Sequence, residues 1–595
     1  FPVILEPVGS SGSAISTQTL ERIKRGYMVC QYDRRDAETM GPVYVENDMN
    51  QLEWWAWNAG RCVDYLYTRS DVDKNKIAVA GHSRGGKSAL LSAVMDERIA
   101  AVIPSHPGSG AGTFNLWRYG GEKFGGETLE ISTRQFPYWN NNRMRFFIGR
   151  ENKMPFDSHF LVGLIAPRAC LISTGILDGV GEVWGDQQSY LESKKVYRLL
   201  GRENALGFYA SPGGHEVTPE MRKDYLDWLD MQFGKKPFAF KENLVYSYTF
   251  DEWKKATGEN INVNNMPEYG MSDILNKADG KKIKTPEEWE AKADLVKRKI
   301  KDIIGTIPDP KTKQIEPAKQ KKAMRGGDLQ TAEIPVDDKV IAHLTWQVQS
   351  KAKVPVVIYL HAYLDSRGWK WHRGYSYDVS VGERLAKNGF LAVEFDQFGY
   401  GLRNLDANID FFKKNKDMSG LGVMMQDVSK VIDAISQLDW VDKNNIVVSG
   451  YSLGGMVGLY SAAFDNRIKA VASISGFGSM RMDSHGVETE GLTRYAYNRP
   501  TIPKLGFFVG NEKKIPYDYH ELLGLIAPRP VFILAPLQDQ DWVYEDVEKC
   551  YEEALKVYDL YGKKDNLVLN SPNDFNRFSI EYQEKVINWL TSLKK

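Results

Sequence analysis

Residues 77–90 read IAVAGHSRGGKSAL, a run of small and β-branched residues that passes directly into a glycine-rich turn and a helix-forming segment. The turn, Gly81 to Gly85, fits the pattern G-x-S-x-G with Ser83 at its centre. Between a strand and a helix, this pattern predicts a sharp turn that lifts the serine hydroxyl to the edge of a parallel sheet. Glycine is needed beside the serine because a side chain would clash there. We therefore predict an α/β fold with Ser83 as a nucleophile, rather than as a simple helix cap.

A serine hydroxyl becomes a nucleophile only when a base removes its proton, and the base needs a carboxylate that orients it. In this kind of fold the chain order is serine, then the acid, then histidine. Asp178 follows the apolar run CLIST at 170–174, and His215 lies in the glycine-rich stretch SPGGHEVTPE before a terminal amphipathic segment. The sequence thus predicts His215 as the base. Asp178 is the preferred acid and Glu182 the alternative.

The chain contains an internal repeat. FFIGRENKMPFDSHFLVGLIAPRACLI, from Phe146, aligns without gaps to FFVGNEKKIPYDYHELLGLIAPRPVFI, from Phe507, at a shift of 361 residues. KNKIAVAGHSRGGKSALLSA, from Lys74, matches KNNIVVSGYSLGGMVGLYSA, from Lys443, at a shift of 369. Features recur in the same order, which favours two homologous domains, 1–236 and 237–595. His159 recurs as His520, which predicts a structural hydrogen bond in both copies.

Each copy alternates short β-branched runs, such as 77–80 and 446–449, with amphipathic stretches, such as 50–68 and 424–441. This alternation predicts tandem α/β-hydrolase domains, each a mostly parallel sheet flanked by helices. The second copy has a lead-in of about residues 241–352, with a predicted helix over 285–305, before the strand VPVVIYLHAYL. The first copy begins directly at the equivalent FPVILEP, so we expect its N-terminal strands to be missing. The alternative is one sheet shared by both copies.

The second copy has a nucleophile turn without a base. Gly450 to Gly454 places Ser452 as Ser83 is placed, and Asp539 stands where Asp178 does. After His520 the sequence contains no histidine, and the stretch SPNDFNRFSIEYQEKV replaces GGHEVTPE. Asn573, Asp574 and Asn576 cannot act as an imidazole base. We predict a silent domain with a structural or substrate-binding role, unless His361 or His485 supplies the base.

Composition restricts the remaining function classes. Lysine plus arginine and aspartate plus glutamate both number 77, which gives no bulk attraction to nucleic acid or anionic membranes. No apolar run of about 20 residues indicates a membrane span. The four cysteines form no CxxC pair, so no zinc or redox motif is indicated, although a Cys30–Cys62 bridge stays open. We expect no metal or other cofactor, and no nucleic-acid partner.

Five stretches carry a family resemblance over about residues 1–235: WAWNAGRCVDYL, GHSRGGKSAL, FGGETLEISTRQFPYW, GRENKMPFDSHFLVGLIAPR and GGHEVTP. Together they resemble the glucuronoyl esterases, carbohydrate esterase family fifteen. The resemblance implies cleavage, without a metal, of the ester between glucuronic acid on xylan and lignin alcohols. It also implies that Arg84 stabilises the oxyanion, Lys87 contacts uronic-acid hydroxyls and Glu127 contacts the sugar. A guanidinium beside the nucleophile suits the first of these roles.

Some positions depart from the family pattern. Many members carry a catalytic glutamate where Gly108 stands, so the acid must come from the later loop. In that loop Val180 occupies the position of a tryptophan, and Trp184 is the candidate replacement for substrate contact. The second copy resembles the acetyl-xylan-esterase-like branch of α/β-hydrolases. A deacetylase of acetylated xylan and a non-catalytic glycan-binding tandem are the alternative functions. The substrate class implies a secreted or periplasmic protein.

Overall fold

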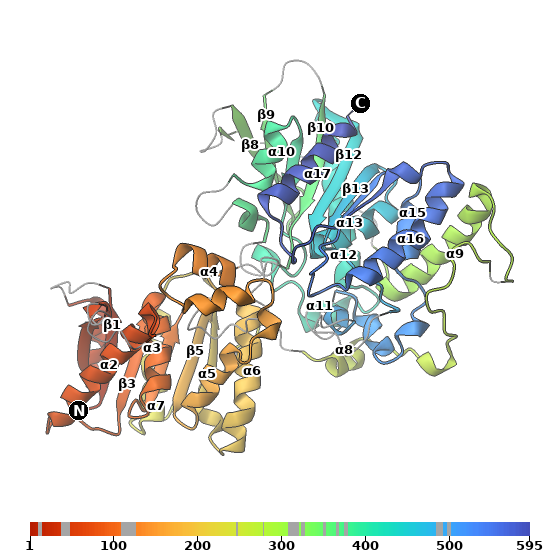
Figure 1. Ribbon diagram of the computed structural model, residues 1–595. Coiled ribbons are helices and arrows are strands. Elements are labelled where there is room, and N and C mark those ends of the chain that lie inside the picture. The colour runs from red at the N-terminus through yellow and green to blue at the C-terminus, as the bar shows by residue number, and fades with distance from the viewer. Residues whose placement is uncertain are drawn as a thin grey trace. The chain divides into compact units, whose positions relative to one another are not determined.

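The computed structural model describes residues 1–9, 15–36, 38, 48–108, 126–245, 248–277, 279–307, 321–322, 328–348, 353–363, 368–373, 379–482, 492–496 and 501–594. The chain divides into two compact units, Phe1–Val245 (unit 1) and Tyr246–Lys595 (unit 2), which are described separately (Figure 1). Each contains its own sheet, so the alternative of one sheet shared by both copies is wrong. No helix among the described residues is long and apolar enough to span a membrane.

Unit 1 is built on a six-stranded sheet in the order β2-β1-β3-β4-β5-β6. All neighbouring pairs are parallel. The central strands are almost fully buried, as expected for short apolar runs in a sheet covered on both faces. The strands are β1 (Val3–Val8), β2 (Met28–Asp33), β3 (Ile77–His82), β4 (Ala101–Ser105), β5 (Ala169–Gly175) and β6 (Leu206–Ser211).

Helices alternate with these strands, and their ends follow local capping rules. Asn50 and Glu53 form a capping box that starts the long helix before the nucleophile turn. Thr218 caps the terminal helix, whose first residue is proline, directly after the His215 loop. The helices are α1 (Thr17–Lys24), α2 (Gln51–Thr68), α3 (Arg84–Met95), α4 (Leu129–Gln135), α5 (Ser158–Ile165), α6 (Val183–Leu199) and α7 (Pro219–Gln232).

Unit 2 repeats this sheet and extends it. The nine strands run in the order β15-β14-β13-β12-β10-β11-β9-β8-β7. Pairs from β15 to β11 are parallel, and β9, β8 and β7 continue the sheet with antiparallel pairs. The strands are β7 (Lys321–Lys322), β8 (Leu329–Pro335), β9 (Ile341–Gln347), β10 (Val354–Leu360), β11 (Leu391–Glu394), β12 (Val441–Tyr451), β13 (Ile468–Ile474), β14 (Val531–Leu534) and β15 (Leu567–Asn570). The predicted mostly parallel α/β architecture is confirmed.

The lead-in of unit 2 is only partly helical. The helix predicted over 285–305 is confirmed: it spans Pro286–Ile304 (α9), is capped by Thr285 and ends at Gly305 with φ +76°. The strands β7, β8 and β9 also fall within 241–352, so the lead-in contains strands that were not predicted from the sequence. The alternating sequences LQTAEIP and IAHLTWQ of β8 and β9 carry the strand signal.

Unit 2 contains nine further α-helices among the described residues. They are α8 (Phe250–Thr257), α10 (Val381–Lys387), α11 (Ile409–Lys414), α12 (Gly420–Ile435), α13 (Leu453–Phe464), α14 (Thr493–Ala496), α15 (Tyr519–Ile526), α16 (Tyr544–Leu560) and α17 (Ile580–Ser592). The helix α12 ends before the stretch QLDWV, which leads into β12, so it is shorter than the amphipathic pattern predicts.

Candidate active site

The nucleophile turn of unit 1 has the predicted geometry. Ser83 lies between β3 and α3 with φ +56°, a left-handed conformation that non-glycine residues rarely adopt. A Cβ on Gly81 would lie 2.1 Å from the carbonyl oxygen of Gly85, so the tight turn requires glycine there. The Ser83 N–H donates to the Ser105 carbonyl at 2.9 Å, which ties the turn to β4. Strain of this kind is characteristic of functional sites.

His215 connects Ser83 to a buried carboxylate. Its Nε2 lies 2.9 Å from Ser83 Oγ and its Nδ1 lies 2.9 Å from Asp178 Oδ2. Asp178 is 1% exposed and also accepts the Val180 N–H at 2.9 Å. Burial raises the pKa of Asp178, but the hydrogen bond and charge of His215 outweigh burial and leave that pKa below its ordinary value. The carboxylate is therefore ionised and holds a proton on Nδ1, which leaves Nε2 to accept from Ser83.

Glu182, the alternative acid, occupies a different position. It is 1% exposed and precedes α6, where its carboxylate accepts the N–H groups of Trp184 and Gly185. This is the N-cap geometry that stabilises a helix start. The carboxylate hydrogen-bonded to His215 is that of Asp178.

Lys87 and Glu127 are brought together as a buried pair. Lys87 Nζ lies 2.8 Å from Glu127 Oε2 and also donates to the Pro107 carbonyl at 2.5 Å. The two side chains are 2% and 4% exposed. Gly108 permits their approach, since a Cβ there would lie 2.9 Å from Glu127 Oε2. Sequence reasoning placed Lys87 and Glu127 separately at a sugar and did not predict the ion pair.

Arg84 is exposed and is held by two aromatic rings. Its guanidinium lies 5.5 Å from the Phe136 ring centre and 5.8 Å from that of Trp139, and those two rings stack at 3.9 Å. The same Trp139 ring also lies near Lys87, whose Nζ is 4.9 Å from the ring centre. Cation–π contacts of this kind orient a guanidinium without neutralising it. The predicted contact residue Trp184 is only 4% exposed, in the first turn of α6.

Two further histidines lie beside His215, and neither of them was predicted from the sequence as a site residue. The ring centres of His82 and His106 lie 4.8 and 6.0 Å from that of His215. His106 is 1% exposed, has φ +47°, and its Nδ1 lies 2.9 Å from Ser105 Oγ. Burial lowers the pKa of His106 to about 4, so it is neutral at physiological pH. Their only sequence signals are their places directly before Ser83 and directly after β4.

In unit 2 an asparagine stands at the position that His215 occupies in unit 1. Ser452 keeps the strained turn, with φ +51°, but is only 3% exposed. Asn576, 361 residues after His215, donates from Nδ2 to Asp539 Oδ1 at 3.1 Å and to Asp541 Oδ2 at 2.9 Å. Its Oδ1 accepts from the Tyr451 hydroxyl at 2.7 Å. An amide nitrogen is not a base, so this arrangement keeps the contact with the aspartate but supplies no group that could accept the Ser452 proton.

From the sequence, two other histidines, His361 and His485, are candidates for the base of Ser452. Both ring nitrogens of buried His361 are engaged: Nε2 accepts the Gln397 N–H at 3.1 Å and Nδ1 bonds to the Ala362 carbonyl at 2.7 Å. His361 is therefore not available as a base. His485 lies outside the described residues.

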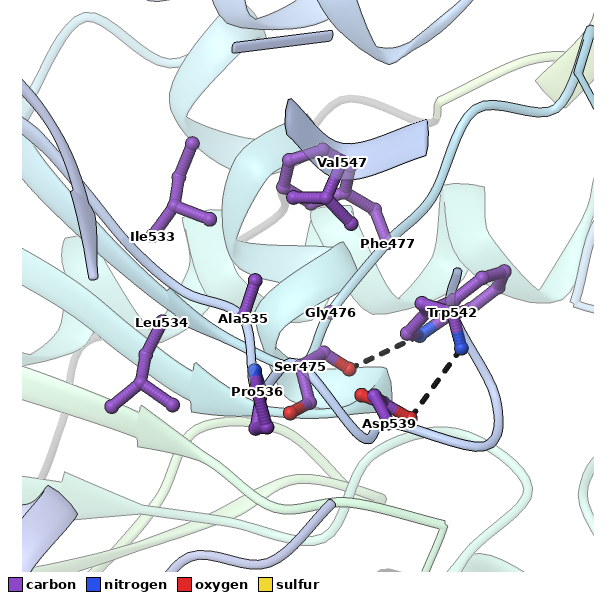
Figure 2. A pocket seen from close by; sticks show the side chains of 10 residues that line it. All are labelled: Ser475, Gly476, Phe477, Ile533, Leu534, Ala535, Pro536, Asp539, Trp542 and Val547. Atoms are coloured by element: carbon purple, nitrogen blue, oxygen red, sulfur yellow. Dashed lines mark hydrogen bonds between the residues drawn. The ribbon is translucent and has the colours of Figure 1, made fainter. Parts of the chain in front are cut away.

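The pocket beside Asp539 is too small for a sugar. Figure 2 shows Trp542 beside Asp539 and Ser475, with its Nε1 donating to the Ser475 carbonyl at 3.2 Å. The cavity lined by these residues and by Phe477 measures about 10 Å³, room for about one water molecule. Ser475 is the counterpart of His106 at the shift of 369, so unit 2 also lacks the second buried imidazole.

Among the described residues, one buried group has ligand types that suit a metal: Asp518, His520 and Cys550. The Asp518 carboxylate already accepts four hydrogen bonds, from the N–H groups of Met480, Arg481 and Tyr519 and the Ser479 hydroxyl. Such a saturated carboxylate caps a helix, and we assign no metal to it. The Nδ1 atoms of His159 and His520 have no partner among the described residues, so the predicted structural hydrogen bond does not involve Nδ1 and stays a prediction for the other ring nitrogen. All four cysteines are free.

A parallel sheet with a strained serine turn after β3, a buried aspartate after β5 and a histidine after β6 defines unit 1 as an α/β-hydrolase. A family model described as glucuronyl esterase, fungi, matches residues 22–201 and 374–562, together more than half of the chain. The chain belongs to the glucuronyl esterase family.

Individual relatives agree with this family but are matched over part of their length. The chain is 30% identical over 191 residues to Carbohydrate esterase MZ0003 from an unknown prokaryotic organism, covering 30% of this chain and 43% of that protein. It is 33% identical over 219 residues to a 4-O-methyl-glucuronoyl methylesterase from Podospora anserina, covering 36% and 41%. The chain thus spans less than half the length of both relatives. A CE15 glucuronoyl esterase structure from Teredinibacter turnerae matches 58% of this chain and 99% of its own, at 17% identity and a TM-score of 0.45.

Proposed function

We propose that unit 1 is a serine carboxylic ester hydrolase that cleaves glucuronoyl esters between xylan glucuronic acid and lignin alcohols. The observation that carries the proposal is the Ser83–His215–Asp178 chain, with both hydrogen bonds at 2.9 Å. Family membership and the relative named 4-O-methyl-glucuronoyl methylesterase support the substrate class.

The proposed reaction uses an acyl-enzyme. Ser83 Oγ attacks the ester carbonyl while His215 Nε2 takes its proton, and Asp178 stabilises the imidazolium that forms. The N–H of Arg84, directly after the nucleophile, faces the developing oxyanion, and the exposed guanidinium of Arg84 adds positive charge beside it. His215 then protonates the departing alcohol, and a water activated by the same imidazole releases the glucuronate.

Lys87 is proposed to bind a uronic-acid hydroxyl. An ammonium has three N–H groups, and two of them reach Glu127 and Pro107. The third has no assigned acceptor among the described side chains and can donate to the sugar. Because Glu127 compensates the Lys87 charge, the pair can stay buried without substrate. Glu127 then positions Lys87, and a direct sugar contact by Glu127 or Trp184 remains a prediction.

Unit 2 is proposed to be catalytically silent and to act structurally or in substrate binding. The contacts of Asn576 and the small size of the cavity beside Asp539 support this. Its likeness to acetyl-xylan-esterase-like hydrolases stays a prediction. A substrate in the plant cell wall supports a secreted or periplasmic location.

A substrate panel tests the proposal. Wild type, Ser83→Ala and Ser452→Ala are compared on benzyl glucuronate and on acetylated xylan. We expect wild type and Ser452→Ala to hydrolyse the glucuronate ester in preference, and Ser83→Ala to be inactive. A preference for acetylated xylan would favour the deacetylase alternative. Binding of xylan without turnover of either ester would favour the glycan-binding alternative.

A further inference from the structure

Two neighbouring helices of unit 1 expose large apolar side chains along one stripe each. On α5, Phe160 and Leu164 are 54% and 63% exposed, and on α6, Val196 and Leu199 are 38% and 84% exposed. Residues three or four positions apart lie on the same side of a helix. A contiguous apolar area of this kind marks an interaction site in a folded protein. We call these four residues the α5–α6 face.

The repeat shows how the same face looks when it is covered. At the shift of 361 residues, Leu164 corresponds to Leu525 and Val196 to Val557, which are 8% and 0% exposed. In unit 2, α9 packs against α15 and α16, the counterparts of α5 and α6 (Figure 1). These two positions are apolar in both units and differ in what covers them, whereas Phe160 corresponds to Glu521.

A pair of glycines locates the contact. A Cβ on Gly524 of α15 would lie 2.7 Å from the Trp289 ring of α9. The counterpart Gly163 on α5 would meet only Val196, at 3.8 Å. Gly163 therefore leaves room for an aromatic ring, although no ring occupies that position in the described part of unit 1.

Two further positions, one aromatic and one cationic, also contact the lead-in in unit 2 and recur in unit 1. Phe507 packs against Phe250 and Trp253 of the lead-in at ring distances of 5.3 and 6.4 Å, whereas its counterpart Phe146 is 79% exposed. Lys504 donates to the Asp302 carbonyl at the end of α9 at 3.2 Å, and the cation at its counterpart position is Arg143.

The partner that fits is defined by α9 itself. Its buried residues form one stripe with charged residues on the other side, and the first of them is an aromatic ring: Trp289, Ala293, Val296, Ile300, Ile303 and Ile304. We infer that the α5–α6 face of unit 1 is a docking surface for an amphipathic helix of this chemistry, with an aromatic residue over Gly163. The edge of the sheet shows the same difference between the units. In unit 2, β11 pairs with β9, whereas no described strand pairs with the outer edge of β2, the counterpart of β11 in unit 1.

A peptide of residues 285–305, fluorescently labelled, tests the inference on the full chain. We expect saturable binding that Leu164→Asp and Leu199→Asp each weaken roughly tenfold or more, the loss expected for a charge in a buried apolar contact. Leu20→Asp is the matched control, because Leu20 is 43% exposed on α1, and it should bind as wild type does. Far-ultraviolet circular dichroism and thermal melting confirm that each variant is folded.

Two results would overturn the inference. One is no saturable binding to the wild-type chain. The other is equal binding to the wild type and to both aspartate variants, which would place the peptide elsewhere, for example on the unit 2 helices that α9 already covers. A scrambled peptide of the same composition should not bind, and equal binding by it would remove the requirement for an amphipathic stripe.

Discussion

Replacing Asp178 by asparagine should cost most of the activity, because the amide reverses the polarity of its contact with His215. The carboxylate accepts the Nδ1 proton at 2.9 Å, whereas an amide can donate there and leave the proton on Nε2. With Nε2 protonated, His215 cannot accept from Ser83. The expected loss in kcat is roughly 10⁴-fold, or about 5 kcal/mol of transition-state stabilisation, with little change in KM.

Glu182→Gln is the matched control for this substitution. Glu182 is as buried as Asp178, but its bonds go to the N–H groups at the start of α6. Glutamine keeps an oxygen acceptor there, so we expect a stability loss of about 1 kcal/mol and a kcat within about threefold of wild type. Initial rates on benzyl glucuronate and urea unfolding separate the two effects. Equal kcat losses in the two variants, or a loss only in Glu182→Gln, would refute the assignment of Asp178.

Three further outcomes follow from the contacts. Lys87→Met should destabilise unit 1 by about 3–5 kcal/mol in urea unfolding because the buried carboxylate of Glu127 loses its ion-pair partner, and adding Glu127→Gln should recover much of that loss. The folded-state pKa of His106 is about 4, below the unfolded value of about 6.5, so its contribution to unit 1 stability is lost as pH falls through this range. His106→Gln should therefore reduce the difference in unfolding free energy between pH 7 and pH 4 by about 3 kcal/mol. Gly163→Ala should raise the melting temperature, by about 0.5–1 kcal/mol of stability, whereas Gly524→Ala should lower it because its Cβ would lie 2.7 Å from Trp289. An unchanged unfolding curve, an unchanged pH dependence, or melting shifts of the same sign would contradict these three expectations in turn.

The triad could be predicted because its signals are local and ordered. The turn around Ser83 is written in five consecutive residues, and the fold places the acid and the histidine after it in sequence. The absence of a histidine from the unit 2 position equivalent to His215 could be predicted for the same reason. The structure adds that Asn576 keeps the contact with Asp539 that a histidine would make.

The pairing around Lys87 could not be predicted, since it depends on packing between distant segments. Glu127 lies 40 residues further along the chain, and only the folded structure shows both side chains buried together. The same holds for His82 and His106, which approach His215 because β3, β4 and the last loop end at one sheet edge. The strands β8 and β9 were predictable from the alternation in LQTAEIP and IAHLTWQ, a weaker signal than the long amphipathic period of 285–305.

The most direct test of the central claim is the rate of benzyl glucuronate hydrolysis by Ser83→Ala and Ser452→Ala in the intact chain. Because Ser83 Oγ lies 2.9 Å from His215 Nε2 and the corresponding position of unit 2 holds Asn576, Ser83→Ala should lose activity by roughly 10³-fold or more, while Ser452→Ala should match wild type. Substantial hydrolysis by Ser83→Ala that disappears only when Ser452 is also replaced would contradict the account.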